Sequence, residues 1–303
     1  MADTNTVKYI LSDETAKIWQ ISERSVRNYC AQGRVPGAIL DGKIWQIPAD
    51  AKKPERSIRH VVKNESVLQV LKREKDSRQK NGLYHKIQID LTYNSNHMEG
   101  SALSHEQTLY IFETKTIGAT EQAVKIDDII ETVNHFRCID LVIDGAKSKL
   151  TESFIKQLHF VLKTGTTDST KTWFAVGDYK RLENEVGGAE TTKAAEVPAA
   201  IKKLLEEYNS LAEPSFDDIL DFHVQFEKIH PFQDGNGRVG RLIMFKECLK
   251  HNFVPFIITE ELKLFYYRGI KNWQEERGYL RDTCLTAQDD MKKVLDYFRI
   301  KYE

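Results

Sequence analysis

The stretch HPFQDGNGRVGR, residues 230–241, carries the densest chemistry in the chain. It follows a segment with an apolar stripe of helical spacing, which Ser215 opens with the pattern of a capping box. Pro231 cannot continue a helix, so His230 is expected at a helix end. Apolar residues resume helical spacing from Leu242 onward. The stretch therefore predicts a tight loop between two helices.

The second half of this loop has the features of an anion site. Gly235 and Gly237 flank Asn236, and glycine permits positive φ and a close approach of the backbone to a ligand. Free N–H groups at a helix N-terminus bind anions. Arg238 and Arg241 are three residues apart and share one face, where two guanidinium groups suit phosphate oxygens. We expect the loop to bind a polyphosphate.

Two titratable side chains of the loop point to the reaction class. Asp234 is its only carboxylate, and Mg²⁺ bound to phosphates takes one or two carboxylates from a protein. His230, with a pKa near neutrality, can act as a general base. Together they predict Mg²⁺-assisted transfer of a phosphorus-containing group. The alternative, a glycine-rich helix start that only caps its own helix, leaves the histidine, the aspartate and the two arginines unexplained.

Composition sets wider limits on the fold and the class of protein. The chain has 303 residues, enough for two domains, and its 41% hydrophobic content excludes wholesale disorder. A net charge of -1 excludes a globally basic nucleic-acid binder. The four cysteines form no C-x-x-C pair, and the isolated histidines, including His159, are expected in the core or on the surface. With no signal peptide or membrane span in the sequence, we expect a cytoplasmic protein without a membrane partner.

Residues 1–50 are predicted to form a small domain of their own. Two short helices are followed by apolar runs on either side of Asp41-Gly42, a strong hairpin signal. Ser12 or Asp13 is expected to cap the first helix, and Ser22 the second. This order is typical of a winged helix-turn-helix.

The rest of the chain is predicted to be mainly α. Residues 51–82 indicate a basic linker and a helix, and residues 83–303 a larger helical domain. The glycines of residues 172–195 favour a hairpin rather than a helix. Apolar spacing predicts helices near residues 84–97, 104–114, 126–144, 151–163, 196–211, 215–229, 236–250, 260–276 and 285–302.

The loop resembles the signature of a known family. HPFQDGNGRVGR matches the Fic-family motif H-P-F-x-D-G-N-G-R-x-x-R at all nine specified positions. Gly177 and Tyr179 also resemble the G-x-Y-R segment of the family, with Lys180 where arginine is common. The resemblance covers roughly residues 85–280 and implies a Fic-type helical bundle with a β-hairpin flap. It does not cover the N-terminal winged helix-turn-helix.

The resemblance also implies an activity, the transfer of AMP from ATP to a Ser, Thr or Tyr hydroxyl of a protein target. By this resemblance His230 deprotonates the hydroxyl and Asp234 holds Mg²⁺ against the phosphates. Arg238 balances the β-phosphate and Arg241 would hold the γ-phosphate. The anion hole is lined by Gly235, Asn236 and Gly237, with Asn236 contacting the α-phosphate.

Two further parts of the site follow from the resemblance alone. The flap is expected at Val186, Gly187 and Gly188, where it would dock the target segment by strand pairing. Tyr267 resembles a tyrosine that lines the adenine pocket. Gln274 stands where the family often has asparagine, so the contacts to the base are not fixed by the sequence.

Residues 94–100 resemble the inhibitory motif [S/T]-x-x-x-E-[G/N] of the family, with Ser95 and Glu99 at its defined positions. An inhibitory helix is therefore expected near residues 84–100. The resemblance implies that Glu99 pairs with Arg241, denies it to the γ-phosphate and leaves the α-phosphate misaligned. The same carboxylate would also suit a water that removes AMP, and the plain alternative is a solvated surface carboxylate.

Other functions stay open at this point. One is a DNA-binding regulator with a self-modifying or de-AMPylating Fic domain, and another is transfer of a different phosphorus-containing group. Residues 1–50 hold six basic and six acidic residues, a balance that disfavours phosphate binding, although the basic linker could supply charge. DNA binding through residues 1–80 and protein docking are both compatible with the sequence, as is a homo-oligomer.

Overall fold

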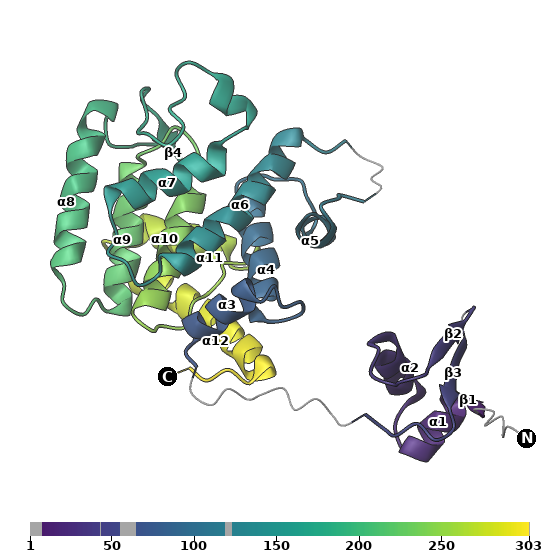
Figure 1. Cartoon of the computed structure of the whole chain (residues 1–303). Helices are drawn as coiled ribbons and strands as arrows, with labels where there is room; N and C mark the ends of the chain where they lie inside the picture. Colours follow the sequence, from purple (N-terminus) through teal and green to yellow (C-terminus); the bar gives the residue numbers. More distant parts are fainter. Residues whose placement is uncertain (1–7, 43, 55–64, 119–122, 303) are drawn as a thin grey trace, which may run out of the picture. The chain divides into compact units, whose positions relative to one another are not determined.

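The computed structural model describes residues 8–42, 44–54, 65–118 and 123–302. Within these residues it has twelve α-helices, two 3-10 helices and two small antiparallel sheets (Figure 1). Contacts divide the chain into two compact units, Met1–Val61 and Val62–Glu303. The mainly helical fold agrees with the prediction. None of the described helices is long and apolar enough to cross a membrane.

The first unit contains two helices and a three-stranded sheet with strand order β1-β3-β2. The expected hairpin is present, and Gly42 at its turn has a φ of +61°. Trp19, Val26 and Ile47 are buried in a core of its own. That this unit is a winged helix-turn-helix stays a prediction. Its elements are β1 (Tyr9–Leu11), α1 (Ser12–Trp19), α2 (Glu23–Ala31), β2 (Ile39–Asp41) and β3 (Ile44–Pro48).

Only one of the two expected helix caps is present in this unit. The Ser22 hydroxyl accepts a hydrogen bond from the Ser25 N–H at the start of α2. The expected cap of α1 is wrong, because β1 runs directly into this helix and Leu11 takes the N-cap position. Ser12 lies inside the helix, and its hydroxyl donates to Glu23 Oε1 at 2.9 Å.

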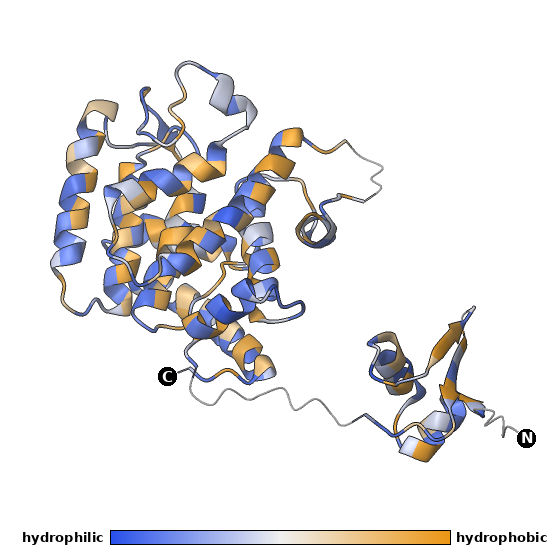
Figure 2. Cartoon of the chain, in the orientation of Figure 1, coloured by the Kyte–Doolittle hydropathy of each residue, from blue (hydrophilic) through white to orange (hydrophobic). Residues whose placement is uncertain are grey.

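The second unit is a helical bundle around one main core. Figure 2 shows that apolar and polar residues alternate around most of its helices, and the buried apolar residues form a continuous cluster. Its elements are α3 (Val67–Asp76), α4 (Leu83–Met98), α5 (His105–Thr114), α6 (Ile126–Asp144), α7 (Glu152–Lys163), η1 (Thr167–Thr170), β4 (Glu185–Val186), β5 (Ala189–Glu190), η2 (Ala194–Glu196), α8 (Val197–Ser210), α9 (Phe216–Ile229), α10 (Asn236–Lys250), α11 (Lys263–Asn272) and α12 (Gly278–Phe298).

Helix α10 is the central helix of this unit. It packs against α4, α6, α7 and α9 (Figure 1), and nearly all of its side chains are buried. A helix that is buried on all sides has little freedom to shift, since the surrounding helices fix it from several directions. The N-terminus of α10, where the 230–241 loop ends, is therefore held in a defined place.

Helix α3 belongs to the packed bundle. Leu68 and Leu71 are buried in its main core, and α3 contacts α4 and α6. Residues 55–64 of the expected linker lie outside the described residues. The domain boundaries at residues 50 and 82 stay predictions.

The predicted start of the last helix is wrong. Helix α12 begins at Gly278, not near residue 285, and it ends at Phe298 with Arg299 in the left-handed region. The start signal in the sequence is weak, because glycine is a weak helix former and the N-cap residue Arg277 makes no side-chain cap. The Gly278 N–H donates instead to Glu276 Oε1 at 3.0 Å. Packing supplies what local propensity does not, since Leu280 is fully buried against α11.

Candidate active site

His230 lies where α9 ends, at the start of the loop. Its backbone is left-handed, with φ 50° and ψ 62°, and its N–H donates to the Phe226 carbonyl. The ring Nδ1 lies 3.3 Å from the Glu227 carbonyl oxygen, which can only accept, so Nδ1 carries the proton. Burial lowers the pKa of His230 below its usual value. The imidazole is thus neutral near pH 7, with Nε2 left to accept a proton.

The loop is held by hydrogen bonds within itself. The Phe232 N–H donates to Asn236 Oδ1 and the Asn236 amide donates back to the Phe232 carbonyl, both at 2.8 Å. Phe232 is fully buried beneath the loop. Because the Asn236 side chain is engaged in this way, its backbone N–H is the group left for a phosphate.

The N-terminus of α10 has the features of an anion site. Gly235 takes the N-cap position with a φ of +83°, and no side chain of the described residues caps the helix. The N–H groups of the first turn have no acceptor within the helix. They carry the positive end of the helix dipole, so this end attracts negative charge.

The Asp234 carboxylate lies beside this helix start and is nearly half exposed. Its Oδ2 accepts from Lys163 Nζ at 2.6 Å and from Arg238 Nη2 at 3.2 Å. Burial alone would raise the pKa of Asp234, but Arg238 and Lys163 lower it to about 2. The carboxylate is therefore ionised and able to bind a cation. No group of three or more His, Cys, Asp or Glu residues in the described ranges could hold a metal ion. A single carboxylate such as Asp234 fits Mg²⁺ whose other ligands are phosphate oxygens and water.

Arg238 is buried and held from two sides. Its guanidinium donates to Glu131 of α6 and to Asp234. Burial would lower the pKa of Arg238, but the two carboxylates raise it. The arginine is thus a fixed positive charge at the first turn of α10.

Arg241 and Glu99 form an ion pair between α10 and the end of α4. Arg241 Nη2 lies 2.6 Å from Glu99 Oε1, and the Ser95 hydroxyl and carbonyl accept from the same guanidinium at 3.0 and 2.9 Å. Arg241 is 4% exposed. Burial would lower the pKa of Arg241, but Glu99 raises it. The guanidinium is fully charged and already occupied by the motif of residues 94–100.

Glycine at position 237 makes room for this carboxylate. A Cβ at Gly237 would lie 2.3 Å from Glu99 Oε1 and 2.9 Å from Arg241 Nη1. Only a residue without a side chain fits such contacts unless Glu99 moves. The Glu99 carboxylate therefore lies directly against the first turn of α10, where the sequence predicts a phosphate.

The predicted flap is a short hairpin. Val186 pairs with Ala189, and Gly187 and Gly188 form its turn with φ angles of +58° and +78°. Two positive φ angles in succession are typical of a two-residue turn, which glycine adopts without strain. Val186 is 43% exposed, so strand β4 presents an apolar side chain to solvent.

Lys180 ties the base of this hairpin together. Its ammonium donates to Asn184 Oδ1 and to Thr191 Oγ1, each at 2.6 Å. Its backbone N–H donates to the Pro231 carbonyl at 2.8 Å, and the Asn184 amide donates to the Phe232 carbonyl at 3.1 Å. The lysine that stands where arginine is common thus connects both strands of the flap to the 230–241 loop.

Tyr267 lies on α11 and is partly exposed. Burial raises the pKa of its hydroxyl, and Glu99 raises it further. The Tyr267 ring is 5.4 Å from that of the buried Tyr266, whose hydroxyl lies 2.5 Å from His223 Nε2. The structure therefore places Tyr267 in the electrostatic range of the Glu99–Arg241 pair, while its role toward a base stays a prediction.

Three charged or polar residues of the site, two of them buried and Glu131 partly buried, were not predicted as part of it. They are Glu131, His159 and Lys163. His159 accepts from the Gly177 N–H at 3.0 Å, lies 3.2 Å from the Asp234 carbonyl and stacks on Phe232. Lys163 follows His159 by four residues, so both fall on the apolar stripe of one helix. A lysine on an apolar stripe is the signal in the sequence that could have identified Lys163 as part of the site.

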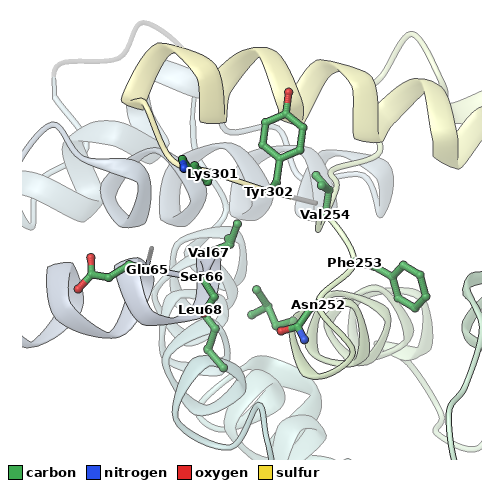
Figure 3. Close-up of a pocket in the computed structure, with 10 residues that line it drawn as sticks. Glu65, Ser66, Val67, Leu68, Asn252, Phe253, Val254, Lys301 and Tyr302 are labelled. Carbon is green, nitrogen blue, oxygen red and sulfur yellow. The ribbon is translucent and has the colours of Figure 1, made fainter. Parts of the chain in front are cut away.

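A separate hollow is lined by none of the predicted site residues. It has a volume of about 380 Å³ and lies between the start of α3, the segment after α10 and the C-terminal residues (Figure 3). Ser66, Asn252, Phe253 and Tyr302 are among the residues around it. We therefore place the candidate active site at the 230–241 loop and not in this hollow.

Comparison with known proteins finds a family match over a part of the chain that includes the 230–241 loop. Residues 149–248 match the model of the Fic/DOC family. A protein adenylyltransferase Fic of Drosophila grimshawi is 24% identical over 220 residues, which are 68% of this chain and 42% of that protein. The counterpart in Drosophila sechellia is 27% identical over 216 residues, again 68% of this chain and 41% of the relative. The chain thus matches less than half of the length of these relatives.

Solved structures share the fold. A Fic-domain-containing signaling protein of Bacteroides thetaiotaomicron is 26% identical, with a TM-score of 0.56 over 76% of this chain and 90% of that chain. Fic-1 of C. elegans, at 17% identity, has a TM-score of 0.59 over 77% of this chain and 72% of that chain, which shows the fold alone. Residues 149–248 thus match the Fic/DOC family model, and the chain is distantly similar to the protein adenylyltransferases called Fic.

Proposed function

We propose that the chain is a protein adenylyltransferase that moves AMP from ATP to a side-chain hydroxyl of a protein target. One observation carries the proposal: a neutral imidazole with Nε2 free to accept a proton lies beside an uncapped helix N-terminus that also holds Asp234, Arg238 and Arg241. Such a helix start binds phosphate oxygens, and a base next to it activates a hydroxyl. The distant homology to protein adenylyltransferases supports the same reaction.

The chemistry follows from these groups. His230 Nε2 takes the proton of the target hydroxyl, whose oxygen forms a bond to the α-phosphorus. The bond from this phosphorus to the bridging oxygen breaks, and pyrophosphate leaves. The backbone N–H groups of the first turn of α10 hold the oxygens of the α-phosphate, and Arg238 balances the charge that develops on the leaving group. Arg241 would bind the γ-phosphate and so align the leaving group with the attacking oxygen.

Asp234 is the residue suited to hold Mg²⁺. Its carboxylate is ionised, partly exposed and placed at the helix start, and both of its side-chain hydrogen bonds use Oδ2. A single carboxylate is typical of Mg²⁺ that is bound mainly through phosphates. When bound, Mg²⁺ would neutralise charge on the phosphate oxygens.

We further propose that Glu99 keeps the enzyme inactive. Its carboxylate pairs with Arg241 and fills the space above Gly237. The γ-phosphate therefore can neither bind Arg241 nor enter this space. A nucleotide that binds elsewhere along the loop would carry a displaced α-phosphorus. A displacement of 1 Å at a reacting centre costs on the order of a hundredfold in rate.

The flap is proposed to dock the target. The exposed strand around Val186 can pair with an extended segment and thus bring its hydroxyl to His230. The hydrogen bonds of Lys180 and Asn184 to the catalytic loop would fix the distance between the two.

The test is self-labelling with ATP that carries the label at the α-phosphate. We expect Glu99→Gly to label on the order of tenfold to a hundredfold faster than wild type. Glu99→Gln, which keeps the shape and removes the charge, is expected to activate partly. Glu99→Gly/His230→Ala is the control and is expected to show no labelling.

Two outcomes would count against the proposal. Equal low labelling of wild type and of folded, ATP-binding Glu99→Gly would contradict inhibition by Glu99. Transfer of a label from the γ-phosphate, with none from the α-phosphate, would indicate a different phosphorus-containing group and contradict adenylyl transfer.

A further inference from the structure

Three carboxylate oxygens from separate parts of the chain converge on the ammonium of Lys163. Nζ lies 2.5 Å from Glu131 Oε1 of α6, 2.6 Å from Asp234 Oδ2 of the catalytic loop and 3.1 Å from Asp168 Oδ2 of η1. The lysine is 2% exposed. An ammonium has three N–H donors, so the three oxygens use its full capacity.

The charge of this lysine is stabilised by its surroundings. Burial would lower the pKa of Lys163, but Asp234 and Glu131 raise it. Glu131 also accepts from Arg238, which donates to Asp234 as well. Two cations and two carboxylates thus alternate in a closed ring, and the carboxylate of Asp234 is fixed from two directions.

The same oxygens would suit a different occupant. Carboxylate oxygens from several segments are what a hard divalent cation binds. Here the ammonium fills the point at which they converge. Without the ammonium, three negative charges would remain close together, with Arg238 beside Glu131 and Asp234 and with Lys171 beside Asp168.

We propose that Lys163 is a positioning residue that serves as a built-in cation for this cluster. It holds Asp234 ready through Oδ2 and prevents the nucleotide-free protein from taking up a divalent metal ion. The metal is then bound only together with the phosphates of the nucleotide. The proposal rests on the proposed function in one respect, that Asp234 is the carboxylate that meets the metal.

The experiment measures binding of Mn²⁺, as a probe for Mg²⁺, to the full chain without nucleotide by electron paramagnetic resonance. The variants are Lys163→Met, which removes the charge at similar length, and Lys163→Arg, which keeps it. Because removing a nearby positive charge strengthens the attraction of the carboxylates for a cation, we expect Lys163→Met to bind Mn²⁺ about tenfold more tightly than wild type. We expect Lys163→Arg to behave as wild type, and the gain to disappear in Lys163→Met/Asp234→Asn.

A second readout follows the melting temperature. Mn²⁺ is expected to raise that of Lys163→Met and to leave those of wild type and Lys163→Arg unchanged. Two results for a folded Lys163→Met would overturn the proposal: Mn²⁺ binding no better than that of wild type, or a melting temperature that Mn²⁺ does not change. Both are what a purely structural ion pair predicts.

Wild type and Asp234→Asn provide a test if Lys163→Met does not fold. Nucleotide-free wild type is expected to bind Mn²⁺ no better than Asp234→Asn, and to bind it better than Asp234→Asn once ATP is added. Binding by nucleotide-free wild type that Asp234→Asn abolishes would overturn the proposal. None of these readouts requires transfer, so a failure of adenylyl transfer in Glu99→Gly would be recognised separately.

Discussion

The Glu227 carboxyl lies in surroundings that disfavour its charged form. It lies in α9 three residues before His230, and its Oε1 has no hydrogen-bond partner among the described residues. Burial raises the pKa of Glu227 to about 8, with Glu99 adding to the rise and Arg241 opposing it. Near neutral pH the Glu227 carboxyl is therefore largely protonated, and Glu99 is the charged carboxylate that pairs with Arg241.

This shift predicts how stability depends on pH. Between its unfolded pKa near 4.5 and its folded pKa near 8, Glu227 binds a proton in the folded state and not in the unfolded state. Its contribution to the free energy of unfolding therefore falls as pH rises through this window and is constant above it. Relative to Glu227→Gln, we expect wild type to lose about 2 kcal/mol or more from pH 5 to pH 8.5.

Urea denaturation at the two pH values measures this difference. The exposed Glu206→Gln is the control and is expected to show no such dependence. A difference between wild type and Glu227→Gln that is the same at both pH values would show that Glu227 does not titrate in this window.

His230 makes a prediction of its own for activity. Its pKa is lowered mainly by burial, and Lys180 lowers it further. Because the neutral imidazole is the base, a lower pKa of His230 keeps it in the active form down to a lower pH. We expect the acid limb of kcat/KM for Glu99→Gly to lie below pH 6.5 and to move to higher pH in Glu99→Gly/Lys180→Met. A limb above pH 6.5, or one that Lys180→Met moves to lower pH, would contradict His230 as the base.

Sequence alone identified the candidate residues of the 230–241 loop, because they are contiguous. Pro231, Gly235 and Gly237 mark its ends and turn, and the two arginines share a helix face. It did not predict Lys163 and Glu131 as part of the site, because their partners come from other helices. Spacing along one segment contains no information on which segment lies opposite.

At the scale of elements, some helices are determined by strong local signals in the sequence, whereas other elements form only through tertiary packing. The capping box of Ser215 starts α9 as predicted. Strand β1 was missed, because its three residues become a strand only by pairing with β3. The start of α12 was missed for a similar reason, since this end of the helix is stabilised by contact with α11.

Gly269 shows how close that contact is. A Cβ at this position would lie 2.6 Å from the Cα of Leu280, which is backbone and cannot turn aside. We expect Gly269→Ala to separate α11 from α12 and to lower the free energy of unfolding by about 1–3 kcal/mol. Urea denaturation measures the loss, and the exposed Lys271→Ala on α11 is the control. A Gly269→Ala variant as stable as wild type would show that the helices can move apart freely.

At the scale of the whole molecule, the chain has two units with cores of their own. Val26 is fully buried in the core of the first unit, and Val142 in that of the second. We expect Val26→Ala to destabilise the first unit by roughly 1–3 kcal/mol and to leave self-labelling in the Glu99→Gly background unchanged. The fluorescence of Trp19 and Trp45 reports unfolding of the first unit.

Val142→Ala is the matched control and is expected to lower the temperature at which labelling is lost. Labelling that falls together with the unfolding of the first unit in Val26→Ala would contradict the independence of the two units. DNA binding by residues 1–80 stays a separate prediction, tested by the salt dependence of duplex binding to the full chain.

The central claim is that His230 and the start of α10 transfer an adenylyl group, and intact-protein mass spectrometry tests it most directly. After incubation of Glu99→Gly with ATP and Mg²⁺, the account predicts a mass increase of whole adenylyl groups on the protein. It predicts no increase in Glu99→Gly/His230→Ala. An increase that corresponds to a phosphoryl group, or an adenylyl increase that persists without His230, would contradict the account.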